Sequence, residues 1–177
     1  MIPVSARLEA IEADITTLSV DAIVNAANSA LQPGGGVDGA IRKRAGRELD
    51  DELSRIGRCE DGEAVITPGF KLTAEYVIHT VAPIWAGAAK RAEQEAALMR
   101  CYANALRLAD EHNIRTLAFP SIGTGAYRWP PDIAAKIAFD TVVKHLKACE
   151  MQTFVTFCCF ARADKERYAA MIAALRE

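Results

Sequence analysis

The segment Phe154–Phe160, with the sequence FVTFCCF, is the strongest constraint on how this chain can fold. Successive side chains of a strand point to opposite faces of a sheet. A strand that is apolar on both faces is therefore typical of the interior of a sheet covered on each side. The segment predicts a central strand, and it makes Cys158 and Cys159 fillers of the core rather than a redox pair.

Shorter apolar runs and longer helical patterns alternate along the rest of the chain. Further strands are expected at Arg7–Ala13, Ala22–Ala27, Glu63–Thr67, Glu75–Val81 and Thr116–Phe119. Helices are expected at Val37–Ala45, Glu48–Ile56, Arg91–His112 and Pro131–Lys147, and a last one, capped by Asp164, through Leu175. Strands alternating with helices predict one α/β domain over residues 1–177, a three-layer α/β/α sandwich. Two places where strands follow each other directly indicate a mixed, mostly parallel sheet.

Composition excludes several classes of function. The net charge of −2 gives no global basic field for nucleic acid or anionic membranes, and the basic residues at 42–44 and 47 are interpreted as a solvated helix face. The N-terminus lacks the pattern of a secretory signal, and no apolar run approaches the ~20 residues that span a bilayer. The five cysteines are odd in number and form no C-x-x-C pair, which favours a reducing cytoplasm. With three dispersed histidines, they also predict no metal site.

Two glycine-rich loops follow predicted strands. The first contains Gly34, Gly36 and Gly39 in a G-x-G-x-x-G pattern, but six residues separate it from its strand, which argues against a dinucleotide-binding turn. The second, Pro120–Pro130, reads PSIGTGAYRWP. Backbone N–H groups at strand exits can bind phosphate without a positive side chain. The loops together could hold a diphosphate, although two ordinary turns remain the alternative.

At five places the sequence resembles the MacroD-type macrodomains, which bind ADP-ribose. The matching segments are DIT (14–16), VDAIVNAAN (20–28), GGGVDGAI (34–41), VIHTVAPIW (77–85) and FPSIGTGAY (119–127). They occur in order and at suitable spacing across nearly the whole chain. The resemblance implies the macrodomain fold, a mixed sheet between two helical layers, and a site that needs no metal or other cofactor.

The resemblance assigns one end of the ligand, the adenine, to three residues. Asp14 would accept a hydrogen bond from the adenine amino group, Ile15 would contribute a backbone contact, and Phe160 would stack on the base. Each assignment has a structural alternative. Asp14 could cap the following turn, and Phe160 could close an apolar strand in the core.

The resemblance assigns the other end of the ligand to the two glycine loops. Asn28 would orient the distal ribose, and Asp38 would act as the general base or position the attacking water; alternatively the ligand's own phosphate activates the water, or Asp38 only caps the helix that follows. Gly36 and Val37 would donate N–H groups to one phosphate and the distal ribose. The diphosphate-binding loop would comprise Ser121, Gly123, Thr124, Gly125 and Ala126, with Tyr127 packing near the distal ribose. By contrast, Asp21 and His79 are interpreted as structural.

The sequence departs from the usual family pattern around these loops. Pro33 stiffens the entry to the first loop, and Ala13 replaces a glycine before Asp14. Arg42 lies one helical turn beyond Asp38, where a guanidinium that reached the carboxylate would make it a poorer base. Arg128 and Trp129 predict a bulkier rim that alters which substrates enter.

The presence of both Asn28 and Asp38 favours an enzyme. The family implies a hydrolase, as in the bacterial O-acetyl-ADP-ribose deacetylases, acting on O-acetyl-ADP-ribose or on mono-ADP-ribosylated aspartate and glutamate side chains of proteins. The alternatives are a non-catalytic ADP-ribose reader and a regulator that binds protein or RNA, of which nucleic-acid binding has only the basic run at 42–47 in its support.

Overall fold

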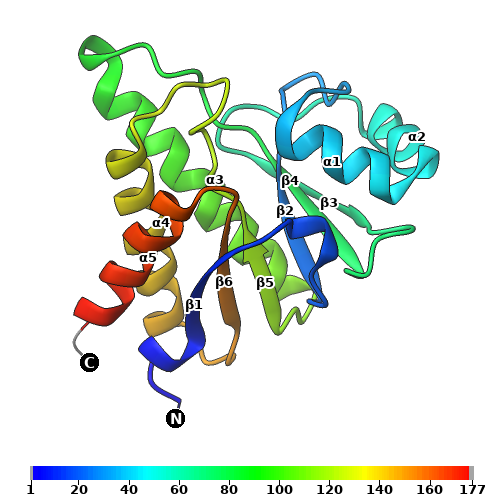
Figure 1. Ribbon diagram of the computed structural model, residues 1–177. Coiled ribbons are helices and arrows are strands. Elements are labelled where there is room, and N and C mark those ends of the chain that lie inside the picture. Colours follow the sequence, from blue (N-terminus) through cyan, green and yellow to red (C-terminus); the bar gives the residue numbers. More distant parts are fainter. Residues whose placement is uncertain (1, 176–177) are drawn as a thin grey trace.

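The computed structural model describes residues 2–175, which form one six-stranded sheet between two layers of helices (Figure 1). The strands are β1 (Leu8–Glu12), β2 (Ala22–Ala26), β3 (Ala64–Pro68), β4 (Tyr76–Thr80), β5 (Thr116–Phe119) and β6 (Phe154–Cys159). The α-helices are α1 (Gly36–Ala45), α2 (Arg47–Ile56), α3 (Arg91–Glu111), α4 (Pro131–Ala148) and α5 (Arg162–Ala174). Short 3₁₀ helices lie at Ser5–Arg7, Ile15–Thr17 and Ala88–Lys90.

The sheet is mixed and mostly parallel, as the sequence predicts. Its strand order is β1-β6-β5-β2-β4-β3, and the pairings are parallel except for that of β3 with β4. The apolar strand β6 lies inside the sheet between β1 and β5, whereas the alternating strand β1 is at an edge. The carboxyl ends of five parallel strands therefore meet along one edge of the sheet.

Alternate side chains of the central strands enter two separate cores. Ile23, Val77 and Ala118 face the layer of α1 and α2, while their neighbours along each strand face α3, α4 and α5. Cys158 and Cys159 divide between the two cores in the same way, and both thiols are free and buried. The prediction that they fill the core is confirmed.

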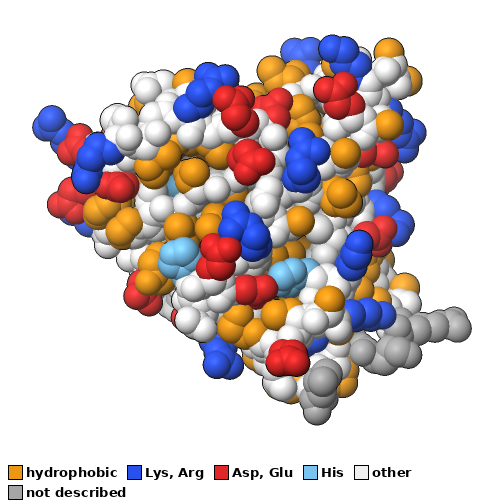
Figure 2. Space-filling view, turned by 180° about the vertical axis from the view of Figure 1, so that it is seen from behind, with side chains coloured by type: hydrophobic (Ala, Val, Ile, Leu, Met, Phe, Trp, Pro, Cys, Tyr) orange, Lys and Arg blue, Asp and Glu red, His pale blue; other side chains and the backbone are white. Residues whose placement is uncertain are grey.

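The outer surface carries charges of both signs without separating them. Figure 2 shows basic and acidic side chains interspersed on the face behind the view of Figure 1. Arg42 does not belong to this surface, because it is only 6% exposed, so the interpretation of the whole basic run as a solvated face is wrong at that residue. None of the helices within residues 2–175 is long and apolar enough to cross a membrane.

Three local predictions need correction. The N-cap of α5 is Ala161, and Asp164 lies in the first turn of the helix, where it pairs with Arg167 at 2.7 Å. Helix α1 is capped by Gly35, so Asp38 lies in its first turn and is not its cap. Phe160 lies beyond the end of β6 and is 95% exposed, which rules out its core role.

Candidate functional site

The predicted site residues gather along the edge where the parallel strands end. Chain segments leave this edge after β1 (Asp14), β6 (Phe160), β5 (121–127) and β2 (28–38), and these four strands are consecutive in the sheet. Ligands of open α/β sheets bind at the carboxyl ends of the strands. The residues that the sequence analysis assigned to one ligand are thus brought to one side of the molecule (Figure 1).

The first glycine loop ends in the N-terminus of α1. Gly36 has φ +55°, in the left-handed region that favours glycine, and it is exposed. The first backbone N–H groups of a helix have no acceptor within the helix. At α1 these groups belong to Gly36, Val37 and Asp38. The N-terminus of α1 therefore presents donors, together with the positive end of the helix dipole, to an anion.

The second glycine loop lies beside the first, because β5 and β2 are neighbours in the sheet. Its turn is closed by Arg128 N–H donating to the Gly125 carbonyl and by Trp129 N–H donating to the Gly123 carbonyl. Among the described residues, no backbone acceptor is recorded for the N–H groups of Gly123, Gly125 and Ala126. The Thr124 hydroxyl donates a hydrogen bond to the Ser121 carbonyl at 2.9 Å. The loop is a second, separately built group of N–H donors.

Gly123 is required by close packing as well as by its backbone. It has φ +85°, and a Cβ placed there would lie 2.6 Å from Cδ1 of Trp129. Trp129 itself is 2% exposed and donates its indole N–H to the Pro83 carbonyl at 2.8 Å. The prediction that Trp129 makes the rim of the site bulkier is therefore wrong, because its ring is buried and packs against Gly123 under the loop. Arg128, with φ +60°, is exposed.

Asp14 and Phe160 lie next to each other at the far end of this edge. The Ala13 N–H donates to the Cys159 carbonyl at 3.1 Å, which pairs the two strand exits. Asp14 caps the short helix after β1, since its Oδ1 accepts from the Thr16 N–H at 2.9 Å and from the Thr16 hydroxyl at 2.7 Å. These bonds to Thr16 hold the pKa of the Asp14 carboxyl below its usual value. Its Oδ2 accepts no hydrogen bond from residues 2–175, so capping still leaves an acceptor for a ligand.

Asp38 is the most heavily bonded residue of the site. The residue is 4% exposed, and its carboxylate accepts from Asn25 Nδ2 at 2.7 Å, from Gly34 N–H at 2.8 Å and from Arg42 Nε at 2.9 Å. An ionised carboxylate offers about four acceptor positions. Three are used here, and the remaining one is on Oδ1, which holds only the bond from Asn25.

The side chain of Asn28 stabilises the loop that follows β2 through two hydrogen bonds. Its Nδ2 donates to the Gln32 carbonyl at 2.8 Å, and its Oδ1 accepts from the Gln32 N–H at 3.1 Å. A Cβ on Gly34 would lie 3.7 Å from Asn28 Nδ2 and 3.3 Å from Asp38 Oδ2. Both polar side chains therefore lie next to Gly34. Because this residue has no side chain, the space beside the two polar groups stays open.

Asn25 belongs to this site, although the sequence analysis assigned it no role. It lies inside β2 with no exposed surface, and besides Asp38 its Nδ2 contacts His79 Nδ1 at 3.0 Å. The His79 Nε2 in turn lies 2.9 Å from the Thr67 hydroxyl. Since Nδ1 faces a donor, the partners assign the imidazole proton to Nε2. The sequence did offer a signal for Asn25, since its side-chain amide interrupts the apolar run AIVNAA. A buried amide needs hydrogen-bond partners, so polar neighbours could have been expected there.

His79 is a satisfied core histidine, as predicted, and it makes stability depend on pH. Burial, reinforced by the charge of Arg42, lowers its pKa from 6.5 to about 3. Below pH 6.5 the unfolded chain binds a proton at this residue and the folded chain does not, so stability falls as the pH falls toward 3. We expect His79→Gln to reduce this loss by up to ~1.4 kcal/mol per pH unit, measured by urea unfolding between pH 7 and pH 4.

His112→Gln is the matched control for this experiment, because His112 is exposed. That variant should keep the wild-type dependence of the free energy of unfolding on pH. Equal slopes for wild type and His79→Gln would contradict a neutral buried imidazole.

A cavity of about 450 Å³ lies beyond the glycine loops, where β4 ends. Ser29, Pro83, Lys90 and Tyr127 are among its lining residues. Burial raises the pKa of Tyr127, with smaller contributions from the charges of Asp61 and Asp38. The phenol is therefore a hydrogen-bond donor at neutral pH, and it borders both the second glycine loop and the cavity.

Comparisons with known proteins agree with this geometry. The family model described as Macro domain matches residues 24–138. A macro domain-containing protein of Ralstonia nicotianae is 53% identical over 161 residues, covering 91% of each chain. An O-acetyl-ADP-ribose deacetylase of Salmonella newport is 46% identical over 173 residues, covering 95% of each. The solved structure of an Oceanobacillus iheyensis macrodomain with ADP has a TM-score of 0.88 and 38% identity, covering 94% of this chain and 90% of the other.

A mutant of the Oceanobacillus iheyensis macrodomain with ADPR is also similar to this chain. It has a TM-score of 0.85 and 38% identity, and the match covers 94% of this chain and 91% of the other. The family model extends over both glycine loops and α1, and the relatives and solved structures cover 91–95% of this chain. The chain belongs to the macro domain family.

Proposed function

We propose that this protein binds ADP-ribose along the edge formed by the ends of β1, β6, β5 and β2. Adenine lies at the Asp14 and Phe160 end, with Ile15 contributing a backbone contact. The diphosphate lies between the N-terminus of α1 and the loop 121–127. This placement is supported by two groups of N–H donors on neighbouring strands. The choice of ligand is supported by the ADP and ADPR in the similar solved structures.

The activity that the site supports best is hydrolysis of an ester on the distal ribose. The observation that carries it is the meeting of Asn28 and Asp38 beside Gly34, at the end of the site that adjoins the cavity. Water would attack the acyl carbon of O-acetyl-ADP-ribose, releasing acetate and ADP-ribose. The same reaction would free an aspartate or glutamate side chain of a mono-ADP-ribosylated protein.

The bonds of Asp38 favour a positioning role over that of a free general base. With Arg42, Asn25 and Gly34 all donating to it, the carboxylate is held in one orientation and most of its acceptor positions are taken. Its remaining acceptor position can orient the attacking water or a ribose hydroxyl. Asn28, fixed by Gln32, holds the ribose, and Tyr127 separates the ribose from the cavity where the acyl group lies.

The direct test is incubation of the purified protein with O-acetyl-ADP-ribose and with a protein mono-ADP-ribosylated on acidic side chains. Release of acetate and ADP-ribose, or of unmodified protein, would support the proposal. ADP-ribose binding without turnover of either substrate would indicate a reader. The ion pair that occupies Asp38 is the feature that would explain such an outcome.

Phe160→Ala should weaken ADP-ribose binding about 5- to 150-fold, because base–aromatic stacking contributes ~1–3 kcal/mol. The ring is 95% exposed, so the free energy of unfolding should change little. Phe154→Ala is the matched control, since Phe154 is 40% exposed at the start of β6, whereas Phe160 follows the end of that strand. Isothermal titration with ADP-ribose separates the two variants. Equal affinities of the two variants for ADP-ribose would show that Phe160 does not stack on the adenine.

A further inference from the structure

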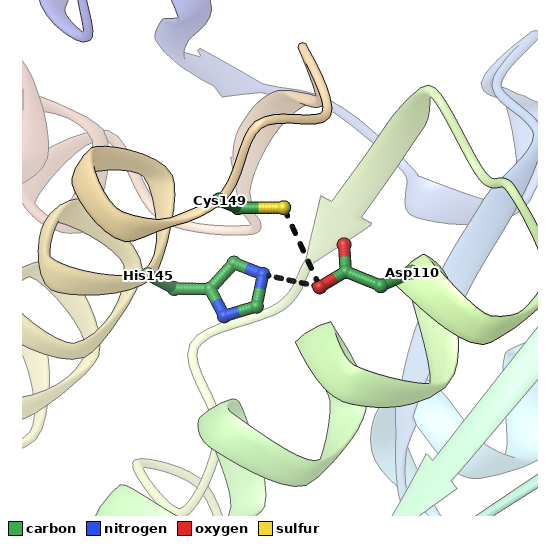
Figure 3. A group of neighbouring side chains, drawn as sticks. All are labelled: Asp110, His145 and Cys149. Atoms are coloured by element: carbon green, nitrogen blue, oxygen red, sulfur yellow. Dashed lines mark hydrogen bonds and ion pairs between the residues drawn. The ribbon is translucent and has the colours of Figure 1, made fainter.

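Three side chains with metal-binding chemistry meet on the side of the molecule away from the proposed ADP-ribose site. Asp110 lies in the last turn of α3, His145 in the last turn of α4, and Cys149 directly follows α4 (Figure 3). Both helices end just before a strand begins, β5 after α3 and β6 after α4. The cluster is therefore at the amino ends of the parallel strands, opposite to the glycine loops.

The ligand atoms of the cluster converge. Asp110 Oδ2 lies 2.9 Å from His145 Nε2 and 3.6 Å from Cys149 Sγ, and one ligand atom from each residue lies within 4.8 Å of the others. Ligand atoms around a tetrahedral zinc ion with ordinary bond lengths are separated by roughly 3.4–3.6 Å. Small side-chain adjustments would bring all three atoms to that geometry.

The hydrogen bonds of the cluster are incomplete without a further partner. His145 Nε2 and Asp110 Oδ1 are buried and have no hydrogen-bond partner among the residues described. The 2.9 Å approach of His145 Nε2 to Asp110 Oδ2 is a close contact without hydrogen-bond geometry. Buried polar atoms without partners are rare in folded proteins, and an ion is one recognised explanation for them.

We propose that Asp110, His145 and Cys149 form a binding site for a divalent transition-metal ion, with zinc as the fitting ion. Thiolate, imidazole and carboxylate are the three ligand types that zinc takes in proteins. The Cys149 thiol now donates to Asp110, and it would release its proton to solvent as the sulfur bonds to the metal. A water molecule completes four-coordination, and the ion ties the ends of α3 and α4 together.

Cys149 is suited to this role by its exposure. The other four cysteines of the chain are buried, whereas Cys149 is partly exposed at the end of its helix. His145 and Cys149 are four residues apart, which places their side chains on one side of the last helical turn. The sequence pattern alone predicted no metal site, because the ligand that would join this pair comes from a different helix.

The test uses the full chain without a polyhistidine tag, titrated with Zn²⁺ and, for spectroscopy, with Co²⁺. We expect one bound ion per chain, thiolate-to-cobalt charge transfer and the visible absorption of tetrahedral Co²⁺. Zn²⁺ should also slow alkylation of Cys149 by iodoacetamide, as located by mass spectrometry. Cys149→Ser and His145→Asn should each weaken Zn²⁺ binding more than ~100-fold, since losing a partner of a ligand already costs ~10–100-fold.

His112→Asn is the matched control, because His112 directly follows α3 and lies outside the cluster. It should bind Zn²⁺ like the wild type. Circular dichroism and urea unfolding establish that each variant is folded. Absence of Zn²⁺ binding by the folded wild type, or unchanged binding by Cys149→Ser, would overturn the proposal. Neither result bears on the proposed hydrolysis of O-acetyl-ADP-ribose, which is measured separately and takes place at the other end of the sheet.

Discussion

Asp38→Ala should lower hydrolysis of O-acetyl-ADP-ribose by at least ~100-fold, because misplacing a reacting group by about 1 Å can already cost that much. The substitution removes the carboxylate that would orient water beside Gly34 and Asn28. Binding of ADP-ribose should persist, because the backbone N–H groups of both glycine loops remain. Initial rates of acetate release, with affinity measured by titration, provide the two readouts.

The alanine variant also leaves Arg42, Asn25 and the Gly34 N–H without their acceptor, so a loss of stability must be separated from a loss of chemistry. Asp38→Asn keeps a side-chain oxygen and nearly the same volume but removes the charge. If the charged carboxylate positions the water, this variant should lose turnover while remaining folded at the assay temperature. Near wild-type turnover in folded Asp38→Asn would assign the activation of water to the ligand's own phosphate.

Asp50→Ala is the control for this position. Asp50 is the second carboxylate that pairs with Arg42, but its side chain is 42% exposed and it lies on α2. Its removal should leave turnover within about a factor of two. A large loss of turnover in Asp50→Ala would instead show that the whole Arg42 network supports catalysis.

Arg42→Met should have the largest effect on stability, a loss of ~3–5 kcal/mol in the free energy of unfolding. Arg42 is 6% exposed, and its guanidinium joins Asp38, Asp50 and the Leu31 carbonyl. Methionine fills much of the space but leaves the buried charge of Asp38 without its cation. Urea unfolding of the variant measures the loss.

Two further variants make this interpretation specific. Lys43→Met changes an exposed charge on the same helix and should alter stability by no more than ~0.5 kcal/mol. Adding Asp38→Asn to Arg42→Met should recover part of the loss, because the double variant buries no unpaired charge. Additive losses would mean that Arg42 acts through its packing and through Leu31, whose backbone has φ +53°.

Much of the fold could be predicted from local patterns. Each strand and each α-helix appears within a few residues of its expected bounds, because apolar periodicity and the glycine and proline stops act locally. Phe154–Phe160 indicated an interior strand, and β6 is one. The errors lie at element ends, as with Asp164 and Phe160, where competing hydrogen bonds or solvent decide the last residue.

The sequence by itself determined the residue types of the site and their order along the chain, through the two glycine loops and the motifs around Asn28 and Asp38. Only the tertiary structure decided which of them meet. Parallel pairing placed the exit of β1 beside that of β6, and burial turned Arg42 inward onto Asp38 and Trp129 beneath Gly123. Asp110 likewise reaches His145 and Cys149 only because α3 packs against α4. Contacts between distant segments depend on how the layers pack, and no local pattern records that packing.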